Sequence, residues 1–452
     1  MAAAFEKNTV SRSWTGPLIA PASCPESADV VIVGGGIVGA ATAWFLARQG
    51  VDVALCEKGH IAGEQSGRNW GWVRQQGRDL RELPMMMESM RIWRELQNEI
   101  GEDVGFEQGG CLFMARKQKE LDAFAAWVDS AGSYGIDTRI ITGRELDAQV
   151  EGASSQWIGA MYTASDGRAE PHKAAPAIAR AAAARGATIL TSCAVRGIET
   201  SGGRVAAVVT EHGTIRTSTV LCAAGAWASL FCRSLDIAVP QLKVKGTVVR
   251  TAPARSLLNG NVFDEKIGIR RRQDGGYTVA HGSILVHPVT PSTLRFAAKF
   301  LPALKQEFKV LRITFGKEFF EEFAMPRRWS LDKESPFEQN RVLDPEPIAS
   351  VVRKIRENLA TTFPELANVE IAEVWAGMVE TSPDVVPIIC PIDSLPGFYL
   401  ATGFSGHGFG IGPGAGKAIA GMLTNTDSGI DLSEFRLQRF FDGSPIRPQS
   451  TV

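Results

Sequence analysis

The stretch VVIVGGGIVG at residues 30–39 joins a run of four apolar β-branched residues to a glycine turn. A helix-like run follows the turn, and a second apolar strand then ends at Glu57. Gly34 permits a tight turn, Gly36 lets the backbone approach a pyrophosphate, and Gly39 lets the helix lie close on the strand. The spacing to Glu57 suits an acid that binds ribose hydroxyls. These features together predict a unit that binds a dinucleotide.

The composition is that of a globular protein with a sizeable core. Hydrophobic residues make up 44 % and charged residues 21 % of the 452 residues, which leaves room for two domains. The 48 Lys and Arg residues nearly balance the 49 Asp and Glu residues. The net charge of -1 gives no general attraction to nucleic acid, so we expect no nucleic-acid partner.

The cysteines and the N-terminal residues bear on the compartment. The seven cysteines form no CxxC pair and no ligand spacing, which predicts buried thiols, a reducing compartment and no metal site. Residues 1–28 lack the features of a signal peptide, and no run reaches the roughly 18 apolar residues of a membrane span. We therefore expect a cytoplasmic protein with no transmembrane segment and an N-terminal arm at residues 1–28.

Hydrophobic periodicity predicts the remaining elements. Helices are expected at residues 84–100, 119–131, 171–185, 293–308 and 348–359, and an apolar helix ends near residue 423. Strands are expected at residues 111–115, 187–190, 194–199, 205–210, 220–223, 243–250, 267–271, 277–281, 371–379, 386–390 and 398–401. We assign the strands at 205–210 and 220–223 to the nucleotide-binding sheet. Thr142 and Glu145 have the spacing of a capping box.

A second glycine-rich turn, GFSGHGFG at residues 403–410, lies near the C-terminus and precedes the apolar helix. Backbone amides at such a turn suit the pyrimidine end of a flavin, where they stabilise the negative charge of the reduced ring. No second GxGxxG follows a strand, which disfavours a separate NADPH domain. The arrangement favours FAD over a nicotinamide cofactor.

Five motifs, in this order along the chain, resemble the FAD-dependent D-amino acid oxidase superfamily, which includes D-amino acid dehydrogenases, glycine oxidase and monomeric sarcosine oxidase. They are the N-terminal unit, SGRN at 66–69, AAGAW at 223–227, the run from WAG at 375–377 to SPD at 382–384, and SGHGF at 405–409. The resemblance implies an α/β fold, with a glutathione-reductase-like FAD-binding Rossmann domain and an inserted, β-sheet-rich α+β substrate domain.

The implied domains are discontinuous in sequence. The FAD-binding domain is expected at residues 29–82, 145–235 and 367–430, the substrate-binding domain at 83–144 and 236–366, and a C-terminal tail at 431–452.

The resemblance also implies the chemistry. The expected reaction oxidises the C–N bond of a small amino acid or secondary amine by hydride transfer to flavin N5, and the resulting imine hydrolyses. The expected electron acceptor is O2, a quinone or a carrier protein, and an oligomer is possible. Two alternatives stay open: an FAD-dependent hydroxylase that needs NAD(P)H, and a non-catalytic flavin subunit of a hetero-oligomeric amine dehydrogenase.

Two positions depart from the sarcosine oxidase pattern. Gly377 stands where those oxidases carry the cysteine that attaches FAD, so we expect non-covalent FAD. Gly410 stands where they carry a lysine that helps to hold the substrate carboxylate, which puts sarcosine itself in doubt as the substrate.

The glycine turns and the resemblance together imply a set of FAD-binding residues. They are Gly34, Gly36, Ile37, Val38, Gly39, Glu57, Lys58, Ser66, Gly67, Arg68, Asn69, Trp70, Gly71, Val195, Ala224, Gly225, Trp227, Gly377, Gly406, His407, Gly408, Phe409 and Gly410.

Arginines before a predicted turn are the candidates to bind the substrate carboxylate. In a strand, Arg270 and Arg272 would share one face and Arg271 would lie on the other. A guanidinium binds a carboxylate through two parallel hydrogen bonds. Glycine oxidase has an arginine before a similar Asp-Gly turn, a resemblance that favours Arg272, with Arg74 as a second candidate. Solvation of the Arg270–Arg272 triplet at the surface is the alternative.

The remaining candidates could serve the site or the packing equally. His407 could contact the flavin or order water, or it could pack at a helix start. Four aromatic residues could line the substrate pocket or belong to the core: Trp70, Trp72, Tyr277 and Trp375.

Overall fold

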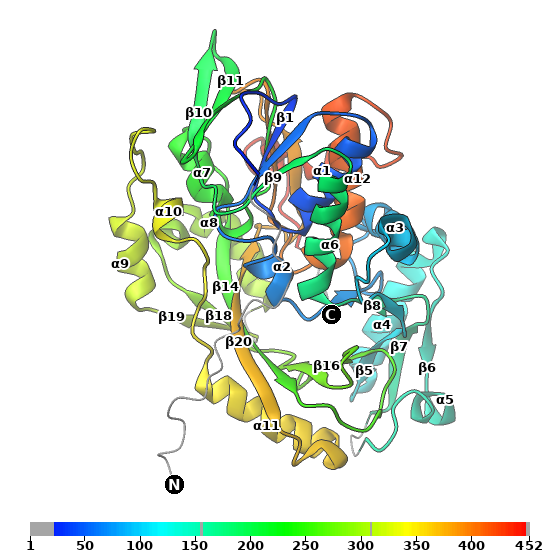
Figure 1. Cartoon of the computed structure of the whole chain (residues 1–452). Helices are drawn as coiled ribbons and strands as arrows, with labels where there is room; N and C mark the ends of the chain where they lie inside the picture. Colours follow the sequence, from blue (N-terminus) through cyan, green and yellow to red (C-terminus); the bar gives the residue numbers. More distant parts are fainter. Residues whose placement is uncertain (1–21, 154–156, 308–309, 449–452) are drawn as a thin grey trace.

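The computed structural model describes residues 22–153, 157–307 and 310–448. Residues 1–21 of the predicted arm and 449–452 of the predicted tail lie outside the described residues. Figure 1 shows a helix-covered sheet around β1 (Val30–Val33) and, below it, a larger sheet that contains the long strand β14 (Leu242–Thr251). The chain is a mixed α/β protein, as predicted.

The first sheet has six strands in the order β21-β22-β13-β1-β2-β9, and all neighbours are parallel except β21 and β22. Its other strands are β2 (Val53–Cys56), β9 (Thr188–Leu190), β13 (Val220–Cys222), β21 (Ile388–Pro391) and β22 (Phe398–Thr402). Strands β1 and β2 are buried on both faces, which explains their unbroken apolar sequences. The glycine turn follows β1, between β2 on one side and β13 on the other, where open α/β sheets bind ligands.

Helices cover one face of this sheet and a small sheet covers the other (Figure 1). The helices are α1 (Ile37–Arg48), α3 (Leu83–Ile100), α6 (Pro171–Ala184) and α12 (Gly408–Thr424). The small antiparallel sheet contains β10 (Val195–Ser201), β11 (Arg204–Thr210) and β12 (Gly213–Arg216). Residues 205–210 therefore lie outside the nucleotide-binding sheet, contrary to the prediction. The turn at Gly202 and Gly203 pairs β11 with β10 as an antiparallel hairpin, and β12 takes the other edge of β11, so β11 has no free edge for the six-stranded sheet.

Helix α3 confirms the predicted helix at residues 84–100. Its apolar stripe of Met86, Met90, Trp93 and Leu96 is buried, and α3 packs against α12. The stripe belongs to the core cluster that contains α1, so α3 packs with the helices on the six-stranded sheet. We expected residues 83–144 in the substrate domain.

The larger sheet has ten strands along the path β19-β18-β14-β17-β16-β15-β5-β7-β6, with β20 paired to β14. Its other strands are β5 (Cys111–Ala115), β6 (Thr138–Ile141), β7 (Gly159–Thr163), β15 (Asn261–Phe263), β16 (Gly268–Arg271), β17 (Tyr277–Ala280), β18 (Leu285–Pro288), β19 (Leu311–Thr314) and β20 (Ile371–Thr381). We expected the residues of β7 and β20 in the FAD-binding domain. Their hydrogen bonds to β5, β6 and β14 place both strands in this sheet.

The remaining α-helices and short strands lie between these elements. They are α2 (Gln65–Arg68), β3 (Trp72–Val73), β4 (Glu107–Gln108), α4 (Gln118–Ala131), α5 (Gly143–Asp147), β8 (Gly167–Arg168), α7 (Ala228–Ser234), α8 (Pro291–Glu307), α9 (Lys317–Ala324), α10 (Pro336–Gln339) and α11 (Ala349–Thr362). Helix α5 begins after Thr142 as predicted, but no capping box forms, because Glu145 pairs with Arg139 instead. Within the described ranges, no helix is long and apolar enough to cross a bilayer.

Candidate active site

Two adjoining cavities define the candidate site. The glycine-turn cavity is lined by the turn after β1, the end of β2, residues 223–227 and the second glycine turn. The large cavity has a volume of about 500 Å³ and is lined chiefly by β14, β18, α8 and the loop after Ser66. Gln65, Asn69, Gly406 and Phe409 line both cavities, so a molecule in the first can reach the second.

The first glycine turn has the geometry of an anion-binding turn. Gly34 has a φ of +112°, a conformation that side chains with a Cβ rarely adopt. A Cβ on Gly39 would overlap the carbonyl oxygen of Gly34, so glycine is needed for α1 to start against β1. Gly36, Ile37 and Val38 line the cavity at the N-terminus of α1. The free amides and the dipole of a helix N-terminus favour a bound pyrophosphate.

Glu57 is held by the backbone inside this cavity. Its Oε2 accepts a hydrogen bond from the N–H of Gly35 at 2.7 Å, and its Oε1 accepts one from the N–H of Gly59 at 2.7 Å. Burial raises the pKa of Glu57. The two amides fix the carboxylate beside the turn, and its remaining lone pairs can accept hydrogen bonds from ligand hydroxyls.

The loop after β2 is tied to the turn by side chains. Ser66 Oγ accepts a hydrogen bond from the N–H of Ile37 at 2.9 Å. Asn69 Nδ2 donates to the Ser66 carbonyl at 2.7 Å, and Asn69 Oδ1 accepts from the N–H of Gly71 at 2.7 Å. Asn69 therefore shapes the loop at the junction of the two cavities.

Gln65 and Gly377 lie against each other at this junction. A Cβ on Gly377 would collide with Gln65 Oε1, an oxygen that is buried with no hydrogen-bond partner. Arg68, on the same loop, pairs with Asp344 and donates to the Ala376 carbonyl at 3.2 Å. A buried acceptor without a donor fits a bound molecule that brings its own N–H group. This acceptor, the glycine cradle and Glu57 together fit FAD.

The structure brings most of the predicted FAD-binding residues together. Lining the glycine-turn cavity are Gly34, Gly36, Ile37, Val38, Glu57, Lys58, Ser66, Asn69, Val195, Ala224, Gly225, Trp227, Gly406, Gly408 and Phe409. Arg68, Trp70, Gly377 and His407 line the large cavity instead. Gly39, Gly67, Gly71 and Gly410 line neither, because their Cα atoms pack against neighbouring backbone.

The large cavity is mostly apolar. Its walls include Phe113, Val248, Phe263, Ile284, Phe300 and Leu304, and the predicted pocket residues Trp70 and Trp72. Leu301 and Ile313 also line it and are 48 % and 51 % exposed, so the cavity opens to solvent beside α8 and β19.

Two arginines from the loop after β3 line the large cavity. Arg74 donates to the Gln76 carbonyl and lies over the ring of Phe113, with 5.1 Å between the guanidinium carbon and the ring centroid. Arg78 is 2 % exposed. Asp166 holds the loop by accepting the N–H groups of Gln75 and Gln76 at 2.7 and 3.2 Å.

His407 joins this group from the second glycine turn. Its Nδ1 donates to Glu82 Oε2 at 3.1 Å, and burial lowers the pKa of the imidazole. His407 therefore lines the large cavity as a positioned, largely neutral side chain at pH 7.

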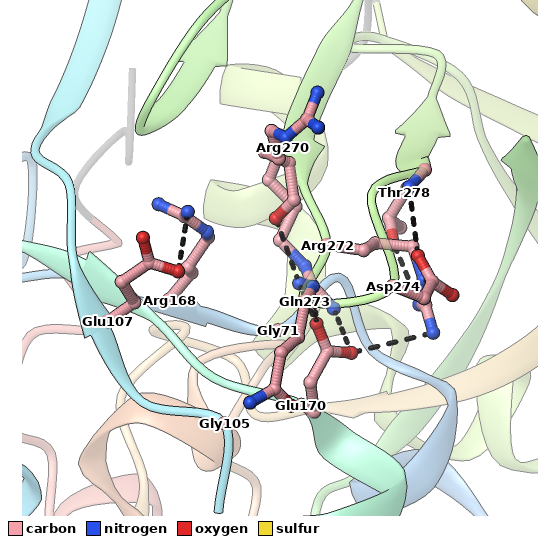
Figure 2. Close-up of polar contacts among 12 residues, drawn as sticks. Gly71, Gly105, Glu107, Arg168, Glu170, Arg270, Arg272, Gln273, Asp274 and Thr278 are labelled. Atoms are coloured by element: carbon pink, nitrogen blue, oxygen red, sulfur yellow. Dashed lines mark hydrogen bonds and ion pairs between the residues drawn. The ribbon is translucent and has the colours of Figure 1, made fainter. Parts of the chain in front are cut away.

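Arg270 and Arg272 lie away from both cavities, on Glu170 (Figure 2). Arg270 Nη1 and Nη2 donate to the two Glu170 oxygens at 2.9 and 3.1 Å, and Arg272 Nη2 lies 3.5 Å from Glu170 Oε2. Burial opposes the charge of Glu170, but Arg270 and Arg272 hold its pKa below the usual value. The two arginines share one face as predicted. The structure does not favour Arg270 or Arg272 as the residue that binds the substrate carboxylate, because both already bind a buried carboxylate of the chain.

Two predicted pocket aromatics belong to the packing. Tyr277 is fully buried in the core under β16 and β17, and its hydroxyl donates to the Arg255 carbonyl at 2.7 Å. Trp375 Nε1 donates to the Arg68 carbonyl at 2.8 Å. Neither residue lines either cavity. Tyr277 packs with Val249 and Val279 on one face of the larger sheet, and Trp375 packs with Val248 and Ala280 on the other.

Sequence reasoning missed Arg78 and Glu380. Glu380 lines the glycine-turn cavity, opposite Lys243 in the β14–β20 register, and burial raises its pKa to about 7. Arg78 lies four residues after Arg74 and could have been considered as a second arginine of the same loop. Glu380 carries no such sequence signal, because only the pairing of β20 with β14 brings it to the cavity.

No metal-binding cluster is found in the part of the chain that the structure describes. The seven cysteines are free thiols, six of them buried and Cys24 half-buried.

A family model described as FAD dependent oxidoreductase matches residues 29–422. Sarcosine oxidase subunit beta from Arthrobacter sp is 26 % identical over 431 residues, which cover 93 % of each chain. Mitochondrial sarcosine dehydrogenase from Mus musculus is 26 % identical over 92 % of this chain, and the chain spans 42 % of that longer protein.

The solved structure of L-amino acid deaminase from Proteus myxofaciens in complex with anthranilate matches with a TM-score of 0.91. Its sequence is 33 % identical, and the match covers 94 % of this chain and 97 % of that one.

Proposed function

The chain belongs to the FAD-dependent oxidoreductase family of the D-amino acid oxidase superfamily, and from this premise we propose that it oxidises an amino acid whose carboxylate binds Arg74. Membership confirms the predicted family, an FAD cofactor and an oxidoreductase enzyme. The observation that carries the proposal is the large cavity, which joins the glycine-turn cavity and contains Arg74.

The glycine-turn cavity is the proposed place of FAD. Gly34, Gly36 and the N-terminus of α1 would hold the pyrophosphate, and Glu57 would hold the ribose. This arrangement supports a glutathione-reductase-like FAD-binding domain, composed of the six-stranded sheet, its helices and the β10–β12 sheet, beside a substrate domain that contains the larger sheet. The larger sheet would form the substrate side.

FAD is held without a covalent bond in this proposal. Gly377 has no side chain to attack the flavin, and Gln65 occupies the space beside it. Acid precipitation of the purified yellow protein should release the flavin into the supernatant. Flavin that stays on the denatured chain would contradict non-covalent binding.

The chain's own residues bind and orient the substrate. FAD, when bound, supplies the hydride acceptor for the carbon that carries the amine. Arg74 would hold the carboxylate through charged hydrogen bonds and so position that carbon. The apolar walls exclude water from the reacting end, which favours the neutral amine that hydride loss requires. The imine product then hydrolyses in water to a keto acid and ammonia or an amine.

The walls of the large cavity favour a substrate with a sizeable apolar side chain. A cavity of about 500 Å³ is larger than glycine or sarcosine needs, and Phe113, Phe263 and Phe300 line it. The similarity to an L-amino acid deaminase and to a sarcosine oxidase subunit supports the amino acid class. We therefore propose an apolar α-amino acid as the substrate, in place of the small amino acid or amine that the sequence led us to expect.

Anaerobic flavin bleaching tests the proposal directly. The FAD-loaded protein is mixed with D- and L-amino acids, N-methyl amino acids and amines without carboxylates, and absorbance near the flavin maximum is followed. Bleaching by apolar amino acids without NAD(P)H supports the proposal. Bleaching only with NAD(P)H indicates a hydroxylase, and no bleaching by any compound indicates a non-catalytic flavin subunit.

The electron acceptor and the assembly state are part of the same proposal. We expect electrons to pass to O2, a quinone or a carrier protein, and rates of reoxidation with each separate the three. The similarity to a sarcosine oxidase subunit suggests a test for an oligomer by light scattering.

A further inference from the structure

Arg78 carries a buried hydrogen-bond donor that the protein leaves unused. The side chain is 2 % exposed and lines the large cavity, and its Nη1 has no hydrogen-bond partner. The nearest carboxylate oxygen, Glu82 Oε2, is 4.0 Å from Nη1 and accepts from His407 instead. Burial lowers the pKa of Arg78 to about 10, so the guanidinium is still charged at pH 7. An unsatisfied charged donor is costly unless a ligand supplies the acceptor.

The other nitrogens of Arg78 fix where Nη1 lies. Nε donates to the Arg74 carbonyl at 3.1 Å, and Nη2 lies 3.5 Å from the His407 carbonyl oxygen. A Cβ on Gly410 would lie 3.2 Å from Nη2, so glycine at position 410 leaves room for this guanidinium. The loop after β3 therefore presents one arginine against the second glycine turn.

The two loop arginines line the large cavity together, and Glu82 is the buried carboxylate nearest to Arg78. Among the described residues, no carboxylate lies within ion-pair distance of Arg74, whereas Arg270 and Arg272 share Glu170. The carboxylate in the cavity wall, Glu307, comes from α8, the helix that carries the exposed Leu301. One anion bound between Arg74 and Arg78 would give Nη1 of Arg78 the acceptor that it lacks.

We propose that Arg78 is a second carboxylate-binding residue, which holds the substrate carboxylate through Nη1 together with Arg74. The proposal rests on the proposed function and adds a residue and a selection rule. Two guanidiniums, one on each side of the carboxylate, should exclude amines that lack it. If Arg78 had only a structural role, it would support the loop through the hydrogen bond from its Nε to the Arg74 carbonyl. Its removal would then weaken the binding of charged and uncharged ligands equally.

Calorimetric titration of the FAD-loaded enzyme with benzoate and with benzamide separates these roles, because the two ligands share their shape and only benzoate carries charge. In Arg78→Met the dissociation constant for benzoate should rise about 10- to 100-fold, the loss of a charged hydrogen bond. Benzamide binding should change far less. Arg78→Lys should recover part of the benzoate affinity.

A relocated charge gives the matched control. In the double variant Arg78→Ala/Gly410→Lys, the lysine can enter the space that Arg78 leaves, and benzoate affinity should exceed that of Arg78→Ala/Gly410→Ala. FAD absorbance and thermal melting check that each variant is folded and loaded.

The outcomes distinguish the proposal from the function on which it rests. Benzoate affinity unchanged in Arg78→Met but lost in Arg74→Met overturns the role of Arg78 and keeps the proposed function. Wild-type enzyme that binds no benzoate, and bleaches with no carboxylate substrate, overturns both. Should Arg78→Met fail to fold, a crystal structure of the wild-type enzyme with benzoate decides: a carboxylate beyond hydrogen-bond distance of Arg78 Nη1 contradicts the proposal.

Discussion

Arginines in this chain differ in role according to the acceptor that each finds. Arg270 is 1 % exposed and donates to Glu170, so a carboxylate of the protein compensates its charge. Arg74 and Arg78 line the large cavity, and Arg78 Nη1 donates no hydrogen bond, because the nearest carboxylate, that of Glu82, is 4.0 Å away. Removing the Glu170 carboxylate should therefore lower stability. Removing the guanidinium of Arg74 or Arg78 should weaken substrate binding.

Arg74→Met should lower kcat/KM for an apolar amino acid by about 100-fold, since charged hydrogen bonds to the carboxylate are lost. FAD content should stay unchanged, because Arg74 lies in the large cavity. Steady-state kinetics under saturating acceptor measure the effect. Arg272→Met is the matched control and should keep KM while lowering the melting temperature. If kcat/KM falls in Arg272→Met and is unchanged in Arg74→Met, then Arg272 and not Arg74 binds the substrate carboxylate.

Glu170→Gln should destabilise the fold by about 3–5 kcal/mol at pH 7, because Arg270 and Arg272 lose their counter-charge in a buried site. The folded pKa of Glu170 lies below its unfolded value near 4.3, so its contribution is present above that pH and is lost as pH falls. Urea unfolding of both proteins from pH 7 to pH 3 measures this. The gap in unfolding free energy should shrink below about pH 5. A constant gap would show that the pKa of Glu170 is the same in the folded and unfolded states.

At the scale of the elements, α1 and α12 pack closely against each other. Both helices begin at a glycine turn that lines the glycine-turn cavity, and they pack together over β1 and β22. A Cβ on Gly416 of α12 would lie 2.6 Å from Ala41 Cβ and 2.8 Å from the Ala41 carbonyl carbon. The helix spacing, and with it the position of both turns, depends on this small residue.

Gly416→Ala should cost about 1–3 kcal/mol by overpacking, which exceeds the gain of up to about 1 kcal/mol from helix propensity. FAD should also dissociate more readily, because α1 must shift relative to α12. Chemical unfolding and flavin retention after gel filtration provide the measurements. Gly132→Ala is the control, since Gly132 is exposed, has a φ of -57° and has nothing within 4 Å of its Cβ direction. An equal loss of stability in both variants would rule out the helix contact as the cause.

At the scale of the whole molecule, the site forms where the two sheets meet. Strand β14 carries Val244, Gly246 and Val248 into the wall of the large cavity, and β20 carries Gly377 and Val379. Figure 1 shows these two strands running together down the molecule. The cavity is therefore a product of strands far apart in sequence.

Gly246→Ile should narrow the large cavity and shift substrate preference from phenylalanine-sized amino acids toward alanine. A Cβ at Gly246 would meet only Leu285 Cδ2, at 3.8 Å, so the larger side chain can be accommodated without backbone strain. The ratio of kcat/KM for the two amino acids, compared across wild type, Gly246→Ala and Gly246→Ile, should fall in that order. An unchanged ratio would mean that the side chain of the substrate lies elsewhere.

Local sequence patterns were enough to predict the cofactor turn, the α/β class and most of the elements, because these depend on short-range features. Gly34 and Gly39 have local steric roles, Glu57 ends a strand at a defined spacing, and β1 and α3 show their periodicity within a few residues. Which arginines line the large cavity depends on the tertiary structure. Arg270 and Arg272 follow the same turn pattern as a carboxylate clamp, but Glu170, about 100 residues earlier in the chain, is folded against them. The places of β7, β20 and Glu380 also depend on the tertiary structure. Strand pairing brings together residues that are far apart in the sequence, and no local pattern predicts which strands pair.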